Sequence, residues 1–492
     1  MALRARRAKP PASPPARDER DLETRLREIR EFAEVPAPVD PEPFVRALGD
    51  PAPVIRRAAA WALGTRRDGR GRSALEASLN DPDAGVRGSA AEALGAIGRA
   101  ESRPALEGLL TDPESRVRAR AAWALWAIGD AQAIPALLPL LTDPEPEVRW
   151  AATAAVGRPG AVASIAPLSE RLKDGHDRVR RQAIYGLAET RDASVPGLVR
   201  PFLADPARRV RVAAAVVAGR YRDREAVPAL LERLAHDEPW VKPSVLVALG
   251  RIGEEASGEA IAAAASDPAG WVRVCAIHAL ADMRHPRTPA VARPLLNDPL
   301  WSVRGAAAEA LGRTGDASDL ARLLAALEDP HPWPRRSAAF AIGLLELSEA
   351  APRVREELSN PAPDVRLAAI WALGRLRDDG AREPVATLLH DLKPTHPSGG
   401  TLATGEGAVR LLTDAESRLF DTAIQALGRL AQGEDDLLVR RALLEARDRV
   451  EDEELDRPAR LAPPELQGAE PPSLRTVFET ALSAVDDDEF GC

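Results

Sequence analysis

The sequence has very few cysteines and aromatic residues, and each shortage excludes a class of protein. Only Cys275 and Cys492 occur in 492 residues, which excludes a disulfide framework and favours a reducing compartment. Aromatic residues make up 4% of the chain, a composition that favours helix over strand. No apolar run reaches the roughly 18 residues that a membrane span needs. We therefore expect a cytoplasmic protein that binds no membrane.

The body of the chain also lacks a net charge. The whole chain carries −9, and residues 451–492 alone hold 12 acidic and 3 basic side chains, which accounts for −9. Residues 1–16 have the opposite character, with Arg4, Arg6, Arg7 and Lys9 and no acids. A neutral body gives no overall electrostatic attraction to nucleic acid, which argues against a nucleic-acid partner.

What the sequence does have is a period of 31 residues. Its marker is the basic residue of a recurring Val-Arg pair, and every interval between successive markers is 31 residues. Such a period is the size of one supersecondary unit and indicates a repeat array. The markers are Arg56, Arg87, Arg118, Arg149, Arg180, Arg211, Lys242, Arg273, Arg304, Arg335 and Arg366.

Each unit is predicted to form two helices. The first carries a proline near its start and an apolar stripe, as in IPALLPLLTD (134–143). The second begins at Asp-Pro and continues as in VRGSAAEALGAIG (86–98), with Asp expected at the N-cap, Pro at N1 and a closing Gly. Because no strand-like alternation separates the units, the fold class is all-α. A helix pair cannot bury its apolar face alone, so the units should stack into a superhelix with a long groove.

The repeat motif resembles a known repeat family. An Asp six residues before an Arg, with Val preceding the Arg, resembles the HEAT repeat. The motif DPxxxVRxxAAxALG is similar to the HEAT-like repeats of the phycobilin lyase group over roughly residues 40–440. The resemblance implies an α-solenoid of about twelve two-helix repeats and a structural ladder of Asp–Arg hydrogen bonds along the stack. The ladder residues include Asp81, Arg87, Asp112, Arg118, Asp143, Arg149, Asp298 and Arg304.

The resemblance leaves the function open, because this repeat class includes scaffolds, lyases and hydroxylases. The related lysine-modifying hydroxylase carries His-Glu pairs as iron ligands, whereas none of the seven histidines here precedes Glu, so no metal site is predicted. Nucleotide-binding and Gly-x-Ser-x-Gly motifs are absent, so neither a catalytic site nor a cofactor is predicted. A bilin-lyase-like protein that handles or chaperones a tetrapyrrole is the first alternative to a scaffold. A nucleic-acid-binding repeat protein is the second.

The aromatic residues fall at particular places in the repeat. On a helical wheel, the position five residues after the marker points away from the buried Val, Ala and Leu face. Aromatic residues at or near that position are predicted to line the groove and bind a partner protein or peptide. The alternative is that these rings pack between neighbouring repeats. The predicted groove residues are Trp61, Trp123, Trp126, Trp150, Tyr185, Phe340 and Trp371.

A second aromatic group lies in the turns between the paired helices of four consecutive units. We predict that it forms a ridge along one edge of the stack, which either binds a partner or joins repeats. Both groups favour a non-catalytic protein-protein interaction scaffold. The turn-edge residues are Trp240, Trp271, Trp301 and Trp333.

The remaining segments interrupt or flank the array. Residues 1–16 are predicted to be a disordered, basic, Pro-rich arm, 17–39 a capping helix and linker, and 40–394 the repeat solenoid. The Gly-rich insertion 395–412 falls within repeat twelve and is predicted to be a surface loop, either without a partner or in contact with one. Residues 413–456 should supply the last repeat helix and a C-terminal cap, and 457–492 an acidic, mostly disordered tail.

Overall fold

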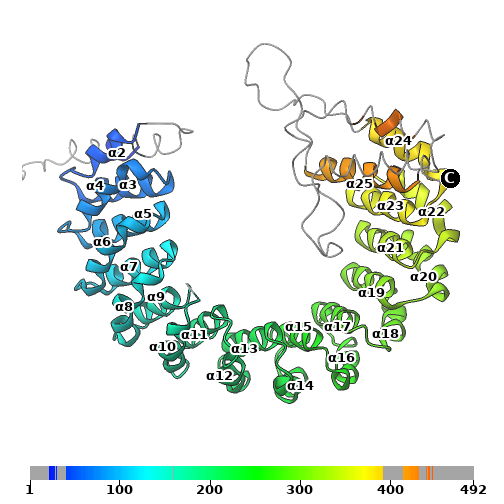
Figure 1. Ribbon diagram of the computed structural model, residues 1–492, viewed down its shortest axis with the longest axis horizontal. Helices are drawn as coiled ribbons and strands as arrows, with labels where there is room; N and C mark the ends of the chain where they lie inside the picture. Colours follow the sequence, from blue (N-terminus) through cyan, green and yellow to red (C-terminus); the bar gives the residue numbers. More distant parts are fainter. Residues whose placement is uncertain are drawn as a thin grey trace, which may run out of the picture. The chain divides into compact units, whose positions relative to one another are not determined.

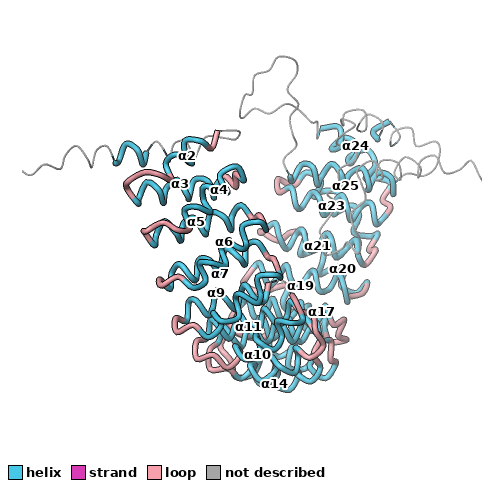
Figure 2. The backbone as a smooth tube through the Cα atoms, turned by 60° about the vertical axis from the view of Figure 1, so that its left-hand side comes forward, coloured by secondary structure: helices cyan, strands magenta, loops and turns pink. Residues whose placement is uncertain are grey.

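A computed structural model describes residues 22–27, 29, 40–158, 160–391, 414–430, 439, 441–443 and 446. Throughout these residues the regular structure is α-helix or 3-10 helix, without any strand (Figure 2). The prediction of an all-α fold is confirmed. The predicted arm 1–16, insertion 395–412 and tail 457–492 lie outside the described residues, so those boundaries stay predictions.

The chain divides into two compact units, Met1–Tyr221 (unit 1) and Arg222–Cys492 (unit 2), which are described separately. Unit 1 is built of two layers of helices (Figure 1). One layer holds the second helix of each repeat: α3 (Pro53–Thr65), α5 (Ala84–Ile97), α7 (Ser115–Ile128), α9 (Pro146–Gly157), α11 (Asp177–Glu189) and α13 (Arg208–Arg220). The other holds the first helices: α2 (Glu42–Ala47), α4 (Arg72–Ser78), α6 (Arg103–Gly108), α8 (Ile134–Leu137), α10 (Ile165–Arg171) and α12 (Val195–Val199).

Unit 2 repeats the same arrangement (Figure 1). Its second helices are α15 (Lys242–Ile252), α17 (Gly270–Asp282), α19 (Trp301–Thr314), α21 (Pro332–Leu344), α23 (Pro363–Leu376) and α25 (Asp414–Leu430). Its first helices are α14 (Val227–His236), α16 (Gly258–Ala264), α18 (Thr288–Leu295), α20 (Leu320–Leu327), α22 (Ala351–Glu356) and α24 (Arg382–Asp391).

Short 3-10 segments precede or extend many first helices. Pro139 and Pro201 lack the amide hydrogen that a continuing α-helix would need, so α8 and α12 pass into 3-10 geometry at these prolines. The segments are η1 (Gly69–Gly71), η2 (Ala100–Ser102), η3 (Leu109–Thr111), η4 (Ala131–Ala133), η5 (Leu138–Thr142), η6 (Val162–Ser164), η7 (Arg200–Ala204), η8 (Arg224–Ala226), η9 (Glu255–Ser257), η10 (Ala317–Asp319), η11 (Ser348–Ala350), η12 (Glu357–Ser359) and η13 (Asp379–Ala381).

The predicted start of the second helix is wrong by two residues. In the third repeat, Asp112 is not the N-cap, because α7 begins at Ser115 and its N-cap is Glu114. The Asp112 carboxylate instead accepts the backbone N–H of Glu114 at 2.9 Å, which closes a turn before the helix. The predicted glycine stop is correct at Gly98 and Gly129, which end α5 and α7 in the left-handed conformation.

The glycine of the Ala-Leu-Gly motif has a different role from the terminal glycine. A Cβ at Gly64 would lie 2.7 Å from the Cα of Ala93, and one at Gly95 would lie 2.7 Å from the Cα of Ala124. These glycines therefore allow consecutive second helices of the core to pack closely. In α7 the equivalent position is occupied by Trp126, which is 37% exposed. A bulky ring thus stands where other repeats have a packing glycine.

Candidate interaction surface

The Asp and Arg residues of the motif form a hydrogen-bonded ladder between neighbouring repeats. Arg118 donates from Nε to Asp143 Oδ2 at 2.8 Å and from Nη2 to Asp143 Oδ1 at 3.0 Å. Its third donor, Nη1, bonds the backbone carbonyl of Asp112 at 2.8 Å. Each guanidinium therefore binds the carboxylate of the next repeat and the backbone of its own. The same pattern joins Arg87 to Asp112 and Arg149 to Asp174.

In unit 2 the ladder varies in composition. Arg273 bonds Asp298, and Arg304 bonds Asp329, in the same two-bond arrangement. Lys242 replaces the first arginine and makes a single bond to Asp267 at 2.8 Å. Near the other end, Asn360 stands at the Asp position. Arg335 bonds Glu357 instead, a partner that lies outside the motif and that the spacing alone did not identify.

The ladder lowers the pKa of several carboxylates. Burial alone would raise the pKa of Asp112, but hydrogen bonds from Arg87 and the Glu114 amide, with the charges of Arg87 and Arg118, outweigh burial and lower it. The pKa of Asp143 is lowered against burial in the same way. The hydrogen bond to Asp143 raises the pKa of Arg118. Asp143 and Arg118 are therefore both held in their charged forms, as a structural ion pair requires.

The second helices of unit 1 carry a compact group of rings, the tryptophan cluster, made of Trp123, Trp126 and Trp150. The ring centroids of Trp123 and Trp126 lie 5.6 Å apart, and those of Trp123 and Trp150 lie 4.9 Å apart, both edge to face. The indole N–H of Trp150 is buried without an acceptor among the described residues. The cluster thus joins α7 to α9 while leaving part of its surface open.

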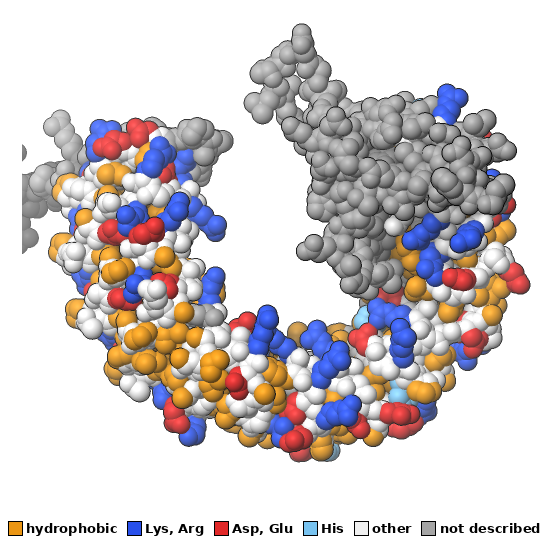
Figure 3. Space-filling model, in the orientation of Figure 1, with side chains coloured by type: hydrophobic (Ala, Val, Ile, Leu, Met, Phe, Trp, Pro, Cys, Tyr) orange, Lys and Arg blue, Asp and Glu red, His pale blue; other side chains and the backbone are white. Residues whose placement is uncertain are grey.

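Arginine side chains border the tryptophan cluster. The guanidinium of Arg158 lies 4.5 Å from the centroid of the Trp126 ring, and that of Arg178 lies 5.6 Å from the centroid of Trp150. Two other predicted groove residues of this unit differ in exposure: Trp61 is 54% exposed and Tyr185 is half-buried. In Figure 3, Lys and Arg side chains follow the margin of unit 1 that its second helices form.

The prediction that the position five after the marker faces solvent is wrong at Ala154 of unit 1, which is buried, and in part of unit 2. Phe340 is only 6% exposed, and its ring contacts the half-buried Trp371 at a centroid distance of 5.2 Å. A Cβ at Gly343 would lie 2.8 Å from the Trp371 ring, so this glycine makes room for it. Phe340 and Trp371 therefore pack between repeats. The Trp371 ring covers the side of α21 that the helical wheel predicted to face solvent.

The predicted turn-edge residues of unit 2 form two ring groups. Their predicted place in the turns is correct only for Trp240, because Trp271, Trp301 and Trp333 lie in the first turns of α17, α19 and α21. The ring centroids of Trp240 and Trp271 lie 5.7 Å apart, and the Trp271 indole N–H donates to the Pro239 carbonyl at 3.3 Å. Trp301 stacks on His331 with centroids 4.0 Å apart and meets Trp333 edge to face at 5.3 Å. Trp240 and Trp271 are 70% and 52% exposed, and Trp301 is also exposed, whereas Trp333 is half-buried against Gly305.

One polar arrangement in unit 2 was not predicted from the sequence. Glu309 accepts a bond from Ser337 Oγ at 3.0 Å and lies 3.5 Å from His278 Nε2, so three neighbouring second helices share one carboxylate. Desolvation would raise the pKa of Glu309, but the nearby His278 imidazole and the hydrogen bond from Ser337 lower it. The signal in the sequence was that His278 and Glu309 occupy the same repeat position in consecutive units. These bonds tie helices together and include no activated nucleophile.

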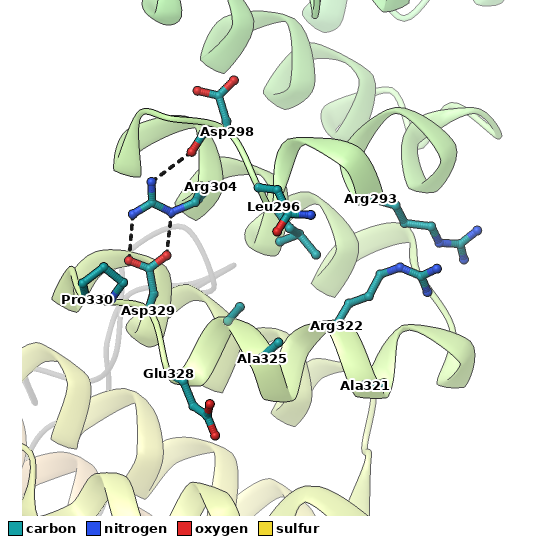
Figure 4. A pocket seen from close by; sticks show the side chains of 12 residues that line it. Arg293, Leu296, Asp298, Arg304, Ala321, Arg322, Ala325, Glu328, Asp329 and Pro330 are labelled. Atoms are coloured by element: carbon teal, nitrogen blue, oxygen red, sulfur yellow. Dashed lines mark hydrogen bonds and ion pairs between the residues drawn. The ribbon is translucent and has the colours of Figure 1, made fainter.

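An open cavity of about 730 Å³ lies between α18 and α20 (Figure 4). Its apolar wall includes Ala321 and Ala325, and its lining includes Arg293 and Arg322. Figure 4 shows these two arginine side chains pointing the same way at one end of the cavity, far from the Arg304–Asp329 rung. Arg293 bonds the buried carboxylate of Asp319 at 2.7 Å, and this ion pair anchors one side of the opening.

The comparisons with known proteins identify the repeat family. A family model described as HEAT repeats matches residues 41–125, 106–188, 195–273, 258–342 and 320–395. The chain belongs to the HEAT-repeat family. No curated protein matches the sequence of this HEAT-repeat protein.

Solved structures resemble the HEAT-repeat chain in fold. A crystal structure of importin beta is 15% identical, covers 96% of this chain and 71% of its own, and has a TM-score of 0.55. Kap95 in its complex with Nup1 is 14% identical and covers 89% of this chain and 67% of its own, with a TM-score of 0.52. The CpcE–CpcF phycocyanin lyase complex of Nostoc sp. PCC7120 is 26% identical over 51% of this chain and 90% of its own, with a TM-score of 0.27 that is too low to carry an argument. The first two likenesses support the α-solenoid fold alone.

Among the described residues, no three His, Cys, Asp or Glu side chains gather closely enough to hold a metal ion. Within the same residues, none of the helices combines the length and the apolar character required to cross a bilayer.

Proposed function

We propose that this HEAT-repeat protein is a non-catalytic, cytoplasmic scaffold that binds a partner protein or peptide. The observation that carries the proposal is the exposure of large rings on a regular framework: Trp61 and Trp126 on the second helices of unit 1, and Trp240, Trp271 and Trp301 on the turn edge of unit 2. Exposed tryptophans at such places serve as anchors in protein interfaces. A fold shared with Kap95, which has been solved with Nup1, supports the same general role.

Exposure separates the rings proposed as anchors from the rings that pack between repeats. Phe340 and Trp371 lie between repeats and contribute to stability. Trp61 makes no ring contact with another aromatic side chain among the described residues, so its exposed surface is not needed to join repeats. We therefore assign partner binding to the exposed rings and exclude the buried ones from the contact surface.

The test is a quantitative pull-down from a lysate of the native host with the immobilised full chain. Trp61→Ala with Trp126→Ala, and separately Trp240→Ala with Trp271→Ala, should each remove partner proteins while changing the melting temperature by no more than about 4 °C. The matched control is Leu138→Ala with Val162→Ala, which removes exposed apolar side chains outside both surfaces. Retention of every partner by both tryptophan variants would overturn the proposal.

A further inference from the structure

The second helices of unit 1 combine exposed rings with an excess of positive charge. Outside the ladder, α3, α5, α7, α9, α11 and α13 carry eight arginines and four acidic residues, a net excess of four positive charges. The second helices α15, α17, α19, α21 and α23 of unit 2 carry four arginines and three acidic residues, an excess of one. The chain as a whole carries a net charge of −9, whereas these second helices of unit 1 carry a net positive charge.

Part of the positive charge on this face is not neutralised by neighbouring acids. Arg120 pairs with Glu92 at 3.0 Å, and Arg220 pairs with Glu189 at 2.7 Å. Arg116 and Arg181, in contrast, form no ion pair among the described residues, and Arg116 is exposed. These two guanidinium groups are available to a carboxylate from another molecule.

The available arginines lie on the helices that carry the tryptophan cluster. Arg116 is on α7, two helical turns before Trp123. Arg181 on α11 occupies the same repeat position as Trp150 on the adjacent α9. Arg178 connects these groups because its guanidinium lies over the Trp150 ring. Three consecutive second helices thus present rings flanked by cations.

We infer that this surface binds an acidic protein segment with apolar side chains between its carboxylates. The carboxylates would pair with Arg116 and Arg181, and an apolar side chain would cover the exposed part of Trp126. This inference rests on the proposed scaffold function and names the chemistry of the partner. Charge complementarity determines the choice, because a basic partner would be repelled by the uncompensated arginines.

Nucleic acid fits the surface less well than an acidic segment. Glu147, Asp177 and Glu189 are interleaved with the arginines on α9 and α11, so a continuous phosphate backbone would meet acids as well as cations. The rings of the tryptophan cluster contact one another edge to face at interplanar angles of 80° and 75°, which leaves no parallel platform on which successive bases could stack.

The test uses the full chain and fluorescence anisotropy with labelled peptides. The probe alternates glutamate with leucine; one comparison peptide has lysine for glutamate, and another has serine for leucine. Binding of the probe should be about tenfold tighter than that of either comparison peptide and should weaken as salt is added. Arg116→Gln with Arg181→Gln should weaken probe binding about fivefold. The control, Arg99→Gln with Lys173→Gln, removes the same charge from unit 1 outside the surface and should leave binding unchanged.

Three outcomes would overturn the inference. Equal binding of the three peptides, while host partners are still lost from the tryptophan variants, would leave the scaffold proposal standing and remove the acidic specificity. Tighter binding of a single-stranded oligonucleotide of the same charge would assign the surface to nucleic acid. A tenfold gain in probe affinity on deletion of residues 457–492 would show that the chain's own acidic segment, and not a separate partner, occupies the surface.

Discussion

Unit 1 and unit 2 share one framework and differ in where they place their rings and charges. The position two residues before the marker illustrates the difference. It holds arginine in three repeats of unit 1, at Arg116, Arg178 and Arg209, and tryptophan in three repeats of unit 2, at Trp240, Trp271 and Trp333. The marker itself and the small residues of the core hardly change between the units. Packing thus fixes the framework positions, whereas the surface positions are free to acquire different binding properties.

The comparison also teaches that one repeat position can have two roles. Five residues after the marker, Trp61 of unit 1 is exposed, while Phe340 of unit 2 is covered by the ring of Trp371. Exposure therefore depends on the side chain in the next repeat as well as on the angle around the helix.

Acid should affect unit 1 more than unit 2. Four ladder carboxylates of unit 1, Asp81, Asp112, Asp143 and Asp174, have a lowered pKa, against Asp267 and Asp329 in unit 2. A carboxylate with a lowered folded-state pKa stabilises the fold above its unfolded pKa of about 4 and ceases to do so as the pH falls through the folded value. Hydrogen exchange followed by mass spectrometry should show α5, α7 and α9 losing protection first below about pH 4. Equal loss in both units would contradict this comparison.

Removal of one buried ring should cost more than removal of one exposed ring at the same repeat position. Phe340→Ala should lower the free energy of unfolding by about 3 kcal/mol, because it leaves a cavity beside Trp371. Trp61→Ala should lower it by less than about 1 kcal/mol. Urea unfolding followed by circular dichroism measures both changes. A similar loss from the two variants would mean that Trp61 also packs between repeats.

Breaking a ladder rung should destabilise unit 1 without removing partner binding. Arg118→Ala leaves the part-buried Asp143 carboxylate with only the Glu145 amide as donor and should cost about 2 kcal/mol. Lys242→Ala removes a single bond and should cost about 1 kcal/mol. The same urea titration compares the rungs, with Lys173→Ala as an exposed control. An Arg118→Ala protein that unfolds normally but binds no partner would contradict the structural role.

The smallest effect is expected at the ends of the second helices. Arg191 has a φ of 55°, at the repeat position where Gly98 has a φ of 72°. Arg191→Gly should raise the free energy of unfolding by about 0.5 kcal/mol, because relief of the left-handed conformation exceeds the extra entropy of glycine in the unfolded chain. Gly98→Ala should lower it by about 1 kcal/mol. Thermal unfolding distinguishes the expected gain of stability in Arg191→Gly from the expected loss in Gly98→Ala. A loss of stability in Arg191→Gly would point to an interaction of the arginine side chain.

The sequence predicted the framework well because the framework repeats. The 31-residue spacing of markers such as Arg118 identified the helix pairs and the family, since each repeat must satisfy the same packing. The N-cap assignment of Asp112 failed because the carboxylate is used by the preceding turn and by Arg87 of the neighbouring repeat. The exposure of Phe340 could not be predicted, because Trp371 from the next repeat decides it.

The direction of the ladder has a consequence for how such a chain can change its length. In a regular rung such as that of Arg118, the guanidinium bonds a carbonyl six residues earlier and a carboxylate 25 residues later, and both partners belong to aspartates at the same repeat position. Loss or duplication of one whole 31-residue unit would bring equivalent donors and acceptors together again. Shortening by any other number of residues would separate them. The array can therefore gain or lose whole repeats without breaking the ladder. Each added repeat would bring its own surface positions, which could bind a further part of a partner.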